Sequence, residues 1–254
     1  MQDEIVRLNK VVQALMNRSE RNASLRGSDF NLFHTAITLE DQVRRRTAEL
    51  EAAMRENEKI TRALRESENR IRQLAFHDAL TQLANRRLLT DRLGQAMAAS
   101  KRSGRYGAVM FLDLDNFKPL NDKHGHEAGD MLLIEVAHRL TLCVREADTV
   151  ARVGGDEFVV MISELDRDRE VSITHARVVA EKVRTALAAP YILTRKHEGD
   201  AETTLEHHCT SSIGVVMFSD KQASQEDILK WADMAMYQAK EAGRNRVSFY
   251  DGAS

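Results

Sequence analysis

Residues 149–162 read Thr-Val-Ala-Arg-Val-Gly-Gly-Asp-Glu-Phe-Val-Val-Met-Ile, and no other stretch says more about the architecture. Two runs of β-branched and apolar residues, 149–153 and 157–163, flank a Gly-Gly turn, so the pattern predicts a β-hairpin. The turn presents Asp156 and Glu157 beside backbone without side chains. Glycine backbone lets a phosphate approach closely, and carboxylates bind hard divalent cations. The hairpin therefore points to chemistry on a metal-bound nucleotide.

A second acidic strand end strengthens this interpretation. The apolar residues before Asp113-Leu114-Asp115 predict a buried strand with carboxylates at its C-terminal end. If the two strands are neighbours, Asp113 and Asp156 converge at one edge of a sheet. Two carboxylates, backbone carbonyls and substrate phosphates form an oxygen ligand set that Mg²⁺ accepts. Metal ions held there can neutralise a leaving pyrophosphate and activate an attacking hydroxyl.

From about residue 76 the sequence alternates between strand and helix patterns. Strands are predicted at 107–113, 149–153, 157–163, 210–218 and 246–250, and helices at 86–102, 128–145, 168–188 and 224–242. This alternation with one tight hairpin predicts an α/β (α+β) layer fold with a mixed, largely antiparallel sheet. The polar segments 116–130 and 190–208 are predicted to be loops.

Segment 28–75 predicts one long helix, because neither Gly nor Pro occurs in it and a heptad pattern runs along it. The seam positions are Leu39, Val43, Arg46, Leu50, Ala53, Asn57, Ile60, Leu64, Ser67, Ile71 and Leu74. The narrow seam and the densely charged flanks favour a dimeric coiled coil over a helix packed on its own domain. Asn57 at a seam position favours a parallel two-stranded register. The predicted division is a short helical segment at 1–27, the coiled coil at 28–75 and a catalytic domain at 76–254.

Composition limits the possible partners of the chain. Its 254 residues are 43% hydrophobic and 30% charged, with a net charge of −2. Such a balanced charge predicts no bulk attraction to a nucleic-acid polymer or a membrane surface. No apolar run is long enough for a membrane span, the acidic N-terminus is unlike a signal peptide, and the two cysteines form no metal or disulfide pattern. We expect a cytoplasmic protein without a membrane segment.

Two further groups of residues are suited to nucleotide contacts. Asn121 and Asp130 can recognise a guanine edge, because a carboxylate accepts the paired N1–H and N2–H₂ donors. Asp130 is equally a candidate helix N-cap. Lys240 and Arg244 are four residues apart at a predicted helix end, where they can share a face and bind phosphates. The alternative is that they are ordinary cations at a helix C-terminus.

These blocks together resemble the GGDEF domain of diguanylate cyclases. The resemblance covers about residues 74–251 and rests on five ordered blocks, at 77–87, 113–130, 154–158, 212–215 and 237–247. The sequence departs from the family at Gln82, where the family usually has Gly, and we expect a small local effect. The resemblance implies condensation of two GTP into cyclic di-GMP with release of two pyrophosphates. It also implies a palm-like, five-stranded mixed sheet with surrounding helices.

The resemblance also implies roles for individual residues. The implied ligands of Mg²⁺, or Mn²⁺, are Asp113, the Leu114 carbonyl and Asp156. The implied catalytic residues are Asp156, Glu157 and Lys118, with Asp156 as the first candidate for the base that deprotonates the ribose 3′-hydroxyl. The implied substrate contacts are Asn121, His126 and Asp130 to guanosine, and Lys240 and Arg244, together with Lys118, to phosphate.

A product-binding site is implied at Arg145-Glu146-Ala147-Asp148, which resembles the RxxD inhibitory site of the family. Arg145 can pair with guanine or phosphate, and Asp148 can accept guanine donors. Lys182 stands where an Arg often contributes a second contact. Without the family spacing, the same residues would be interpreted as a surface salt bridge at a helix end.

Dimerisation belongs to the predicted mechanism, because ring closure needs two GTP-loaded domains facing each other, and a coiled coil raises their effective concentration. The alternatives are a catalytically inactive domain that acts as a cyclic di-GMP receptor, a pure dimerisation module, and a cyclase that uses ATP. The pair His77-Asp78 also occurs in metal phosphohydrolases, but further ligands at suitable spacing are missing, so we interpret it as structural.

Overall fold

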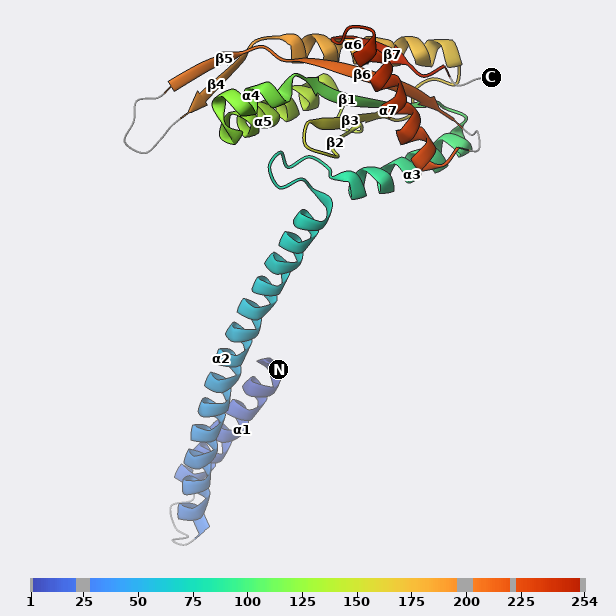
Figure 1. Ribbon diagram of the computed structural model, residues 1–254. Helices are drawn as coiled ribbons and strands as arrows, with labels where there is room; N and C mark the ends of the chain where they lie inside the picture. The colour runs from blue at the N-terminus through green and yellow to red at the C-terminus, as the bar shows by residue number, and fades with distance from the viewer. Residues whose placement is uncertain (1, 22–27, 196–202, 220–222, 252–254) are drawn as a thin grey trace. The chain divides into compact units, whose positions relative to one another are not determined.

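The computed structural model describes residues 2–21, 28–195, 203–219 and 223–251 (Figure 1). The chain divides into two compact units, Met1–Arg70 and Ile71–Ser254. We describe each unit by itself.

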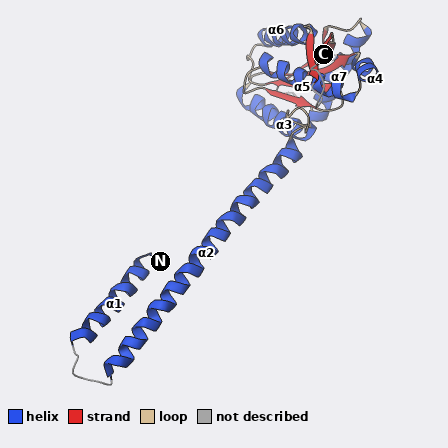
Figure 2. Cartoon of the chain, turned by 90° about the vertical axis from the view of Figure 1, so that its left-hand side faces the viewer, coloured by secondary structure: helices blue, strands red, loops and turns tan. Residues whose placement is uncertain are grey.

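The first unit is a pair of helices. Helix α1 (Gln2–Arg21) lies beside the first part of α2 (Ser28–Phe76), as both ribbon views show (Figures 1 and 2). A groove between the two helices has an apolar lining that includes Leu8, Val43 and Leu50. Helix α2 extends over the whole predicted heptad segment. Later seam residues are exposed, with Ile60 at 60% and Leu64 at 59%.

The second unit is built on a five-stranded sheet in the order β2-β3-β1-β6-β7. Its strands are β1 (Gly107–Asp115), β2 (Thr149–Arg152), β3 (Glu157–Ile162), β6 (Thr210–Phe218) and β7 (Val247–Phe249). All neighbouring strands are antiparallel except β6 and β7, which are parallel. The predicted mixed, largely antiparallel sheet is therefore confirmed, with strand boundaries close to those expected.

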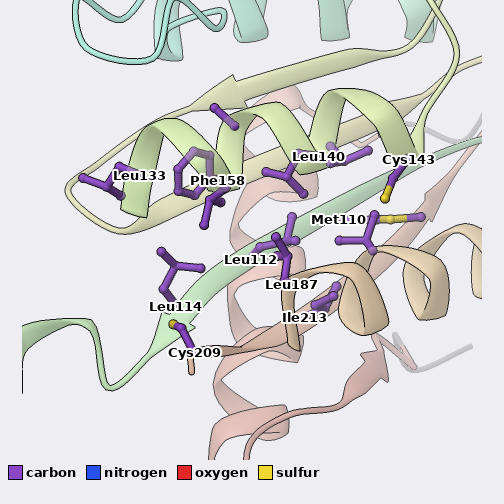
Figure 3. Close-up of a cluster of buried hydrophobic side chains, with 14 of the residues drawn as sticks. Met110, Leu112, Leu114, Leu133, Leu140, Cys143, Phe158, Leu187, Cys209 and Ile213 are labelled. Carbon is purple, nitrogen blue, oxygen red and sulfur yellow. The ribbon is translucent and has the colours of Figure 1, made fainter. Parts of the chain in front are cut away.

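Side chains of the central strand β1 alternate between two hydrophobic cores. Met110, Leu112 and Leu114 face a core shared with α5 (His126–Cys143) and α6 (Arg169–Ala188) (Figure 3). Val109 and Phe111 face a second core shared with α3 (Arg86–Ser103) and α7 (Gln225–Glu241). Because strand side chains alternate with period two, Asp113 and Asp115 continue this second face beyond the apolar core. The acids of β1 thus lie on the α7 side of the sheet.

Capping residues define the starts of helices α3 and α7, and a glycine lets α7 pack closely on the sheet. The Asn85 side chain accepts a hydrogen bond from Leu88 N at the start of α3, and Ser224 and Asp227 form a capping box at the start of α7. Gly214 lets α7 pack directly on β6, since a Cβ atom there would lie 2.1 Å from the Ala232 carbonyl oxygen. The backbone of α7 is therefore held close to the sheet edge that carries the acids.

The prediction of a loop at 190–208 is wrong for its described part. Strands β4 (Tyr191–Arg195) and β5 (Thr203–His207) pair antiparallel as a second sheet, and residues 196–202 lie outside the described chain. Tyr191 is fully buried, and the Arg139 guanidinium lies 3.8 Å from the centre of its ring. Burial of this aromatic side chain stabilises the pairing despite the polar composition of the segment.

The prediction of a loop at 116–130 is also wrong. Helix α4 (Phe117–His124) and the first turns of α5 occupy this segment, with Gly125 between them. Pro119 falls in the first turn of α4, where proline is tolerated because its missing N–H would have no intrahelical partner. Asp130 is the fifth residue of α5, so the alternative that it is the N-cap is wrong as well.

Candidate active site

The Gly-Gly hairpin and the acidic end of β1 meet as expected. Asp113 lies opposite Glu157 in the antiparallel register of β1 and β3. The backbone N–H of Leu114 donates to the carbonyl of Asp156 over 3.3 Å, and that of Val153 donates to Glu157 over 3.0 Å to close the turn. A Cβ atom at Gly155 would meet open space. This turn therefore presents bare backbone beside two carboxylates.

Negative side chains outnumber positive ones around Asp113. Lys240 on α7 places Nζ 2.7 Å from Asp113 Oδ2, and both side chains are largely buried. Burial raises the pKa of Asp113, the hydrogen bond and charge of Lys240 lower it, and the neighbouring Asp156 and Glu157 raise it, with a net increase. One cation is therefore insufficient for three carboxylates, and a further positive charge would stabilise the ionised cluster.

The donor set suits a divalent metal that is shared with a substrate. Asp113, Asp156 and the Leu114 carbonyl come from two adjacent strand ends, and oxygen donors of this kind suit Mg²⁺ or Mn²⁺. Among the described residues, no group of three or more His, Cys, Asp or Glu side chains is arranged to hold a metal alone. Mg²⁺ usually keeps open positions for water and phosphate, so this sparse set fits a metal that arrives with a nucleotide.

The candidate guanosine contacts lie on α4 and α5. Asn121 Oδ1 is buried and has no hydrogen-bond partner among the described residues. Gly129 makes room for it, since a Cβ atom there would lie 1.9 Å from this oxygen. Asp130 is exposed on the next position of α5. An unpaired buried acceptor is costly, and a ligand donor would satisfy it.

Three candidate residues are not joined to the acidic cluster. Lys118, His126 and Arg244 are exposed, and in the described part of the chain no contact links their side chains to Asp113, Asp156 or Glu157. Lys240, a candidate phosphate contact, places its ammonium against Asp113. In this structure Lys240 is therefore part of the carboxylate cluster.

The residues of the implied product site line one cavity. Arg145, Asp148 and Lys182 surround a volume of about 510 Å³ together with Arg105 and His175. Asp148 Oδ2 accepts from the backbone N–H of Arg145 over 3.0 Å, and Lys182 Nζ donates to the Cys143 carbonyl over 2.9 Å. Sequence reasoning missed Arg105 and His175, because no local motif connects them with Arg145.

Asp78 anchors the turn that follows α2. Its Oδ1 accepts from Thr81 N over 2.8 Å and from Arg152 Nη1 over 3.1 Å, and Arg152 Nη2 donates to the Gly155 carbonyl over 2.8 Å. Burial opposes ionisation of Asp78, but the hydrogen bonds from Thr81 and Arg152 outweigh it and lower its pKa. The His77-Asp78 pair is thus structural, and Asp78 holds the hairpin through Arg152.

A family profile matches the sequence that forms this site. The profile described as "Diguanylate cyclase, GGDEF domain" matches residues 75–246. The chain belongs to this family. The GGDEF domain is 42% identical over 181 residues to the bifunctional diguanylate cyclase/cyclic di-GMP phosphodiesterase MucR of Pseudomonas aeruginosa, which covers 71% of this chain and 24% of MucR. The chain thus spans about a quarter of the length of that relative.

Solved structures share the fold of this GGDEF domain. The coiled coil and GGDEF domain of DgcB from Caulobacter crescentus, in complex with cyclic di-GMP, matches with a TM-score of 0.67 and 28% identity, over 79% of this chain and 98% of that one. SiaD from Pseudomonas aeruginosa, in complex with its activator SiaC, matches with a TM-score of 0.58 and 27% identity, over 96% and 88%. None of the described helices combines the length and the apolarity that crossing a membrane requires.

Gln82, where the resemblance leads us to expect Gly, has a backbone conformation that favours glycine, and this has a testable effect. Gln82 has φ 59°, in the left-handed region that glycine adopts without steric cost. We expect Gln82→Gly to stabilise the GGDEF domain by about 0.5–1 kcal/mol in a denaturant titration, because relief of strain exceeds the added chain entropy. The same change at the exposed helical residue Gln95 is expected to destabilise it by about 1 kcal/mol. Equal destabilisation by both changes would contradict the strain argument.

Proposed function

We propose that this GGDEF domain condenses two GTP into cyclic di-GMP with release of two pyrophosphates, in a reaction that depends on Mg²⁺ or Mn²⁺. The observation that carries the proposal is the register of β1 and β3, which brings Asp113, Leu114 and the Asp156-Glu157 turn together beside Lys240. The family match and the activities named for relatives such as MucR support the same reaction.

In the proposed mechanism, Asp113, the Leu114 carbonyl and Asp156 would hold the metal. When bound, the metal supplies positive charge to the phosphates and lowers the pKa of the attacking hydroxyl. Glu157 or Asp156 accepts the proton of the ribose 3′-hydroxyl, and the hydrogen bond and charge of Lys240 favour the ionised form of Asp113. Lys118 and Arg244 stabilise charge on the triphosphate, with Lys240 as a further cation beside it.

Recognition of guanine is proposed for the α4–α5 pair. The unpaired Asn121 Oδ1 can accept a donor of the nucleoside, and the exposed carboxylate of Asp130 can accept the N1–H and N2–H₂ donors that adenine lacks. His126, the first residue of α5, is proposed as a further contact to guanosine. This arrangement favours GTP over ATP as the substrate.

We propose that the active form is a homodimer joined through α2. Each domain holds one GTP, so ring closure needs a second loaded domain. The exposed apolar seam around Ile60 and Leu64 supplies the surface that a parallel partner helix would cover. The division into a short N-terminal helical segment at 1–27, a dimerising coiled-coil helix at 28–75 and a catalytic domain at 76–254 remains our proposal.

Product inhibition is proposed for the cavity of Arg145, Asp148 and Lys182. We expect Arg145→Ala to raise the cyclic di-GMP concentration for half inhibition of the initial rate by about 10–100-fold, because a charge-assisted bidentate contact is lost. Arg102→Ala, at an exposed arginine of α3 outside this cavity, is the matched control. Unchanged inhibition in Arg145→Ala would place the regulatory site elsewhere.

The cytoplasm is the proposed location. The substrate GTP is a cytoplasmic metabolite, and Cys143 and Cys209 are free and buried. Burial raises the pKa of Cys143, and it raises that of Cys209 to about 12, so both thiols are expected to stay protonated.

A direct assay tests the proposed function. Purified protein is incubated with GTP and MgCl₂, with and without excess EDTA, and the nucleotides are separated by chromatography, with Asp156→Ala alongside. We expect cyclic di-GMP and pyrophosphate only from the unchanged chain with metal. The cavity around Arg145 favours a second candidate, a catalytically inactive receptor. No product, together with binding of labelled cyclic di-GMP that Arg145→Ala abolishes, would support the receptor and reject the cyclase.

A further inference from the structure

Asp115 is a buried carboxylate to which the mechanism above gives no role. It lies two residues after Asp113 on the same face of β1, and its exposed fraction is only 4%. Burial of a carboxylate is costly unless hydrogen bonds compensate for the lost water. The hydrogen-bond partners of Asp115 therefore show which part of the structure this buried carboxylate holds in place.

Those partners connect the sheet with the loop that follows α7. Asp115 Oδ1 accepts from Ser212 Oγ over 2.8 Å, and Oδ2 accepts from Thr210 Oγ1 over 2.7 Å. Oδ2 also accepts from the backbone N–H of Asn245 over 3.1 Å. Thr210 lies directly opposite Asp115 in the register of β1 and β6. The carboxylate thus bonds the first residues of β6 and the segment after α7 at the same time.

The loop that Asp115 holds has an unfavourable backbone conformation. Gly243, Arg244 and Asn245 have φ angles of 111°, 61° and 45°, so three consecutive residues lie in the left-handed region. For a non-glycine residue this conformation is unfavourable, and it persists only where surrounding contacts fix it. Besides the bond from Asn245 to Asp115, Arg244 N donates to the Ala239 carbonyl over 3.0 Å and Arg184 Nη1 donates to Asn245 Oδ1 over 2.9 Å.

Arg244 is the residue that this loop presents. It follows Lys240 by four positions, and Lys240 already contacts Asp113 over 2.7 Å. Asp113 and Asp115 therefore each fix one part of the C-terminal end of α7: Asp113 holds the Lys240 ammonium, and Asp115 holds the backbone next to Arg244. A carboxylate suits the second task because it offers acceptors to three donors at once.

We infer that Asp115 is a positioning residue, whose carboxylate fixes the left-handed loop 243–245 so that Arg244 can bind the β- and γ-phosphates of the substrate. The inference rests on the proposed function, since it takes Arg244 as a phosphate contact. It assigns Asp115 no contact with metal, base or reacting atoms. Loss of Asp115 thus weakens recognition of the triphosphate and spares recognition of the nucleoside.

Binding measurements on the full chain test this inference without turnover. The probes are guanosine 5′-α,β-methylenetriphosphate, which resists transfer at its first phosphorus atom, and GMP, which lacks the outer phosphates. Both are titrated by calorimetry in MgCl₂. We expect Asp115→Ala to weaken binding of the triphosphate analogue about tenfold and binding of GMP less than about twofold. In an Arg244→Ala background, Asp115→Ala is expected to change analogue affinity by less than about twofold, because both changes remove the same contact.

Three results would overturn the inference: unchanged affinity for the analogue, a parallel loss for GMP, or additive losses in the double variant. If Asp115→Ala does not fold, Asp115→Asn carries the same cycle. The amide of this variant keeps one acceptor for Asn245 N–H and can donate to Ser212, so we expect an intermediate loss of affinity for the triphosphate analogue. In the Arg244→Ala background, this loss of affinity should again be absent. An unchanged chain that binds neither probe would reject the proposed function itself.

Discussion

Asp113→Asn is expected to lower the rate of cyclic di-GMP synthesis by at least about a hundredfold at millimolar Mg²⁺. The change removes one of only two carboxylates in the proposed metal site. Mutation of residues that merely orient metal ligands already lowers metal affinity or activity about 10–100-fold. Because the amide keeps an oxygen close to Lys240 Nζ, which lies 2.7 Å from Oδ2 in the unchanged chain, the position of α7 should be preserved. Initial rates measured over a range of Mg²⁺ and Mn²⁺ concentrations check the prediction, and part of the loss should be recovered at high metal.

The stability of this variant separates a metal defect from a folding defect. The folded-state pKa of Asp113 is raised by burial and by repulsion from Asp156 and Glu157, more than Lys240 lowers it. A raised carboxyl pKa means that ionisation at neutral pH destabilises the fold, so a neutral amide should keep or raise the Tm without metal. Asp122→Asn, at an exposed acid of α4, is the matched control with expected normal rates. A lowered Tm in Asp113→Asn would indicate that the activity is lost through unfolding and not through the metal site.

The sequence predicted the parts of the fold that local patterns determine. The strands of the sheet and the helices α3, α6 and α7 were recognised because their apolar residues recur with period two or 3.6. Helix α4 was missed because segment 116–130 is polar, and its Pro119 lies in the first turn, where a proline breaks no hydrogen bond. The β4–β5 hairpin was missed because its stability comes from the burial of Tyr191 beneath Arg139, a contact between distant segments.

The same distinction holds at the candidate site. Asp113, Asp156 and Glu157 were selected from their strand ends, and the observed register joins them. The contacts of Lys240 with Asp113 and of Arg152 with Asp78 cross long stretches of sequence, so no local pattern could indicate them. Asp115 was treated as one more strand-end acid, because its neutral partners Thr210, Ser212 and Asn245 N become apparent only when β6 and the loop after α7 lie beside it.

Placing charge on the seam of α2 is expected to have the second large effect. Ile60→Glu with Leu64→Glu should lower the rate of synthesis about a hundredfold at submicromolar protein. Both side chains are about 60% exposed in the single chain, so the change should cost the fold little. In a coiled-coil dimer the same positions become buried, and unpaired carboxylates there are strongly unfavourable. The lost dimer also loses the high effective concentration of the two GTP-loaded domains.

The concentration dependence of this variant distinguishes a dimerisation defect from damage to the catalytic domain. If the two half-sites must then meet by diffusion, the rate per chain should rise in proportion to protein concentration, whereas that of the unchanged dimer should stay constant. Ala48→Glu with Ala52→Glu adds the same charge at exposed positions away from the seam, and this control should remain dimeric in sedimentation and fully active. A monomeric seam variant with an unchanged rate would contradict the requirement for a dimer. A dimeric variant with a lost rate would show that α2 acts on the catalytic domain in another way than by joining two copies.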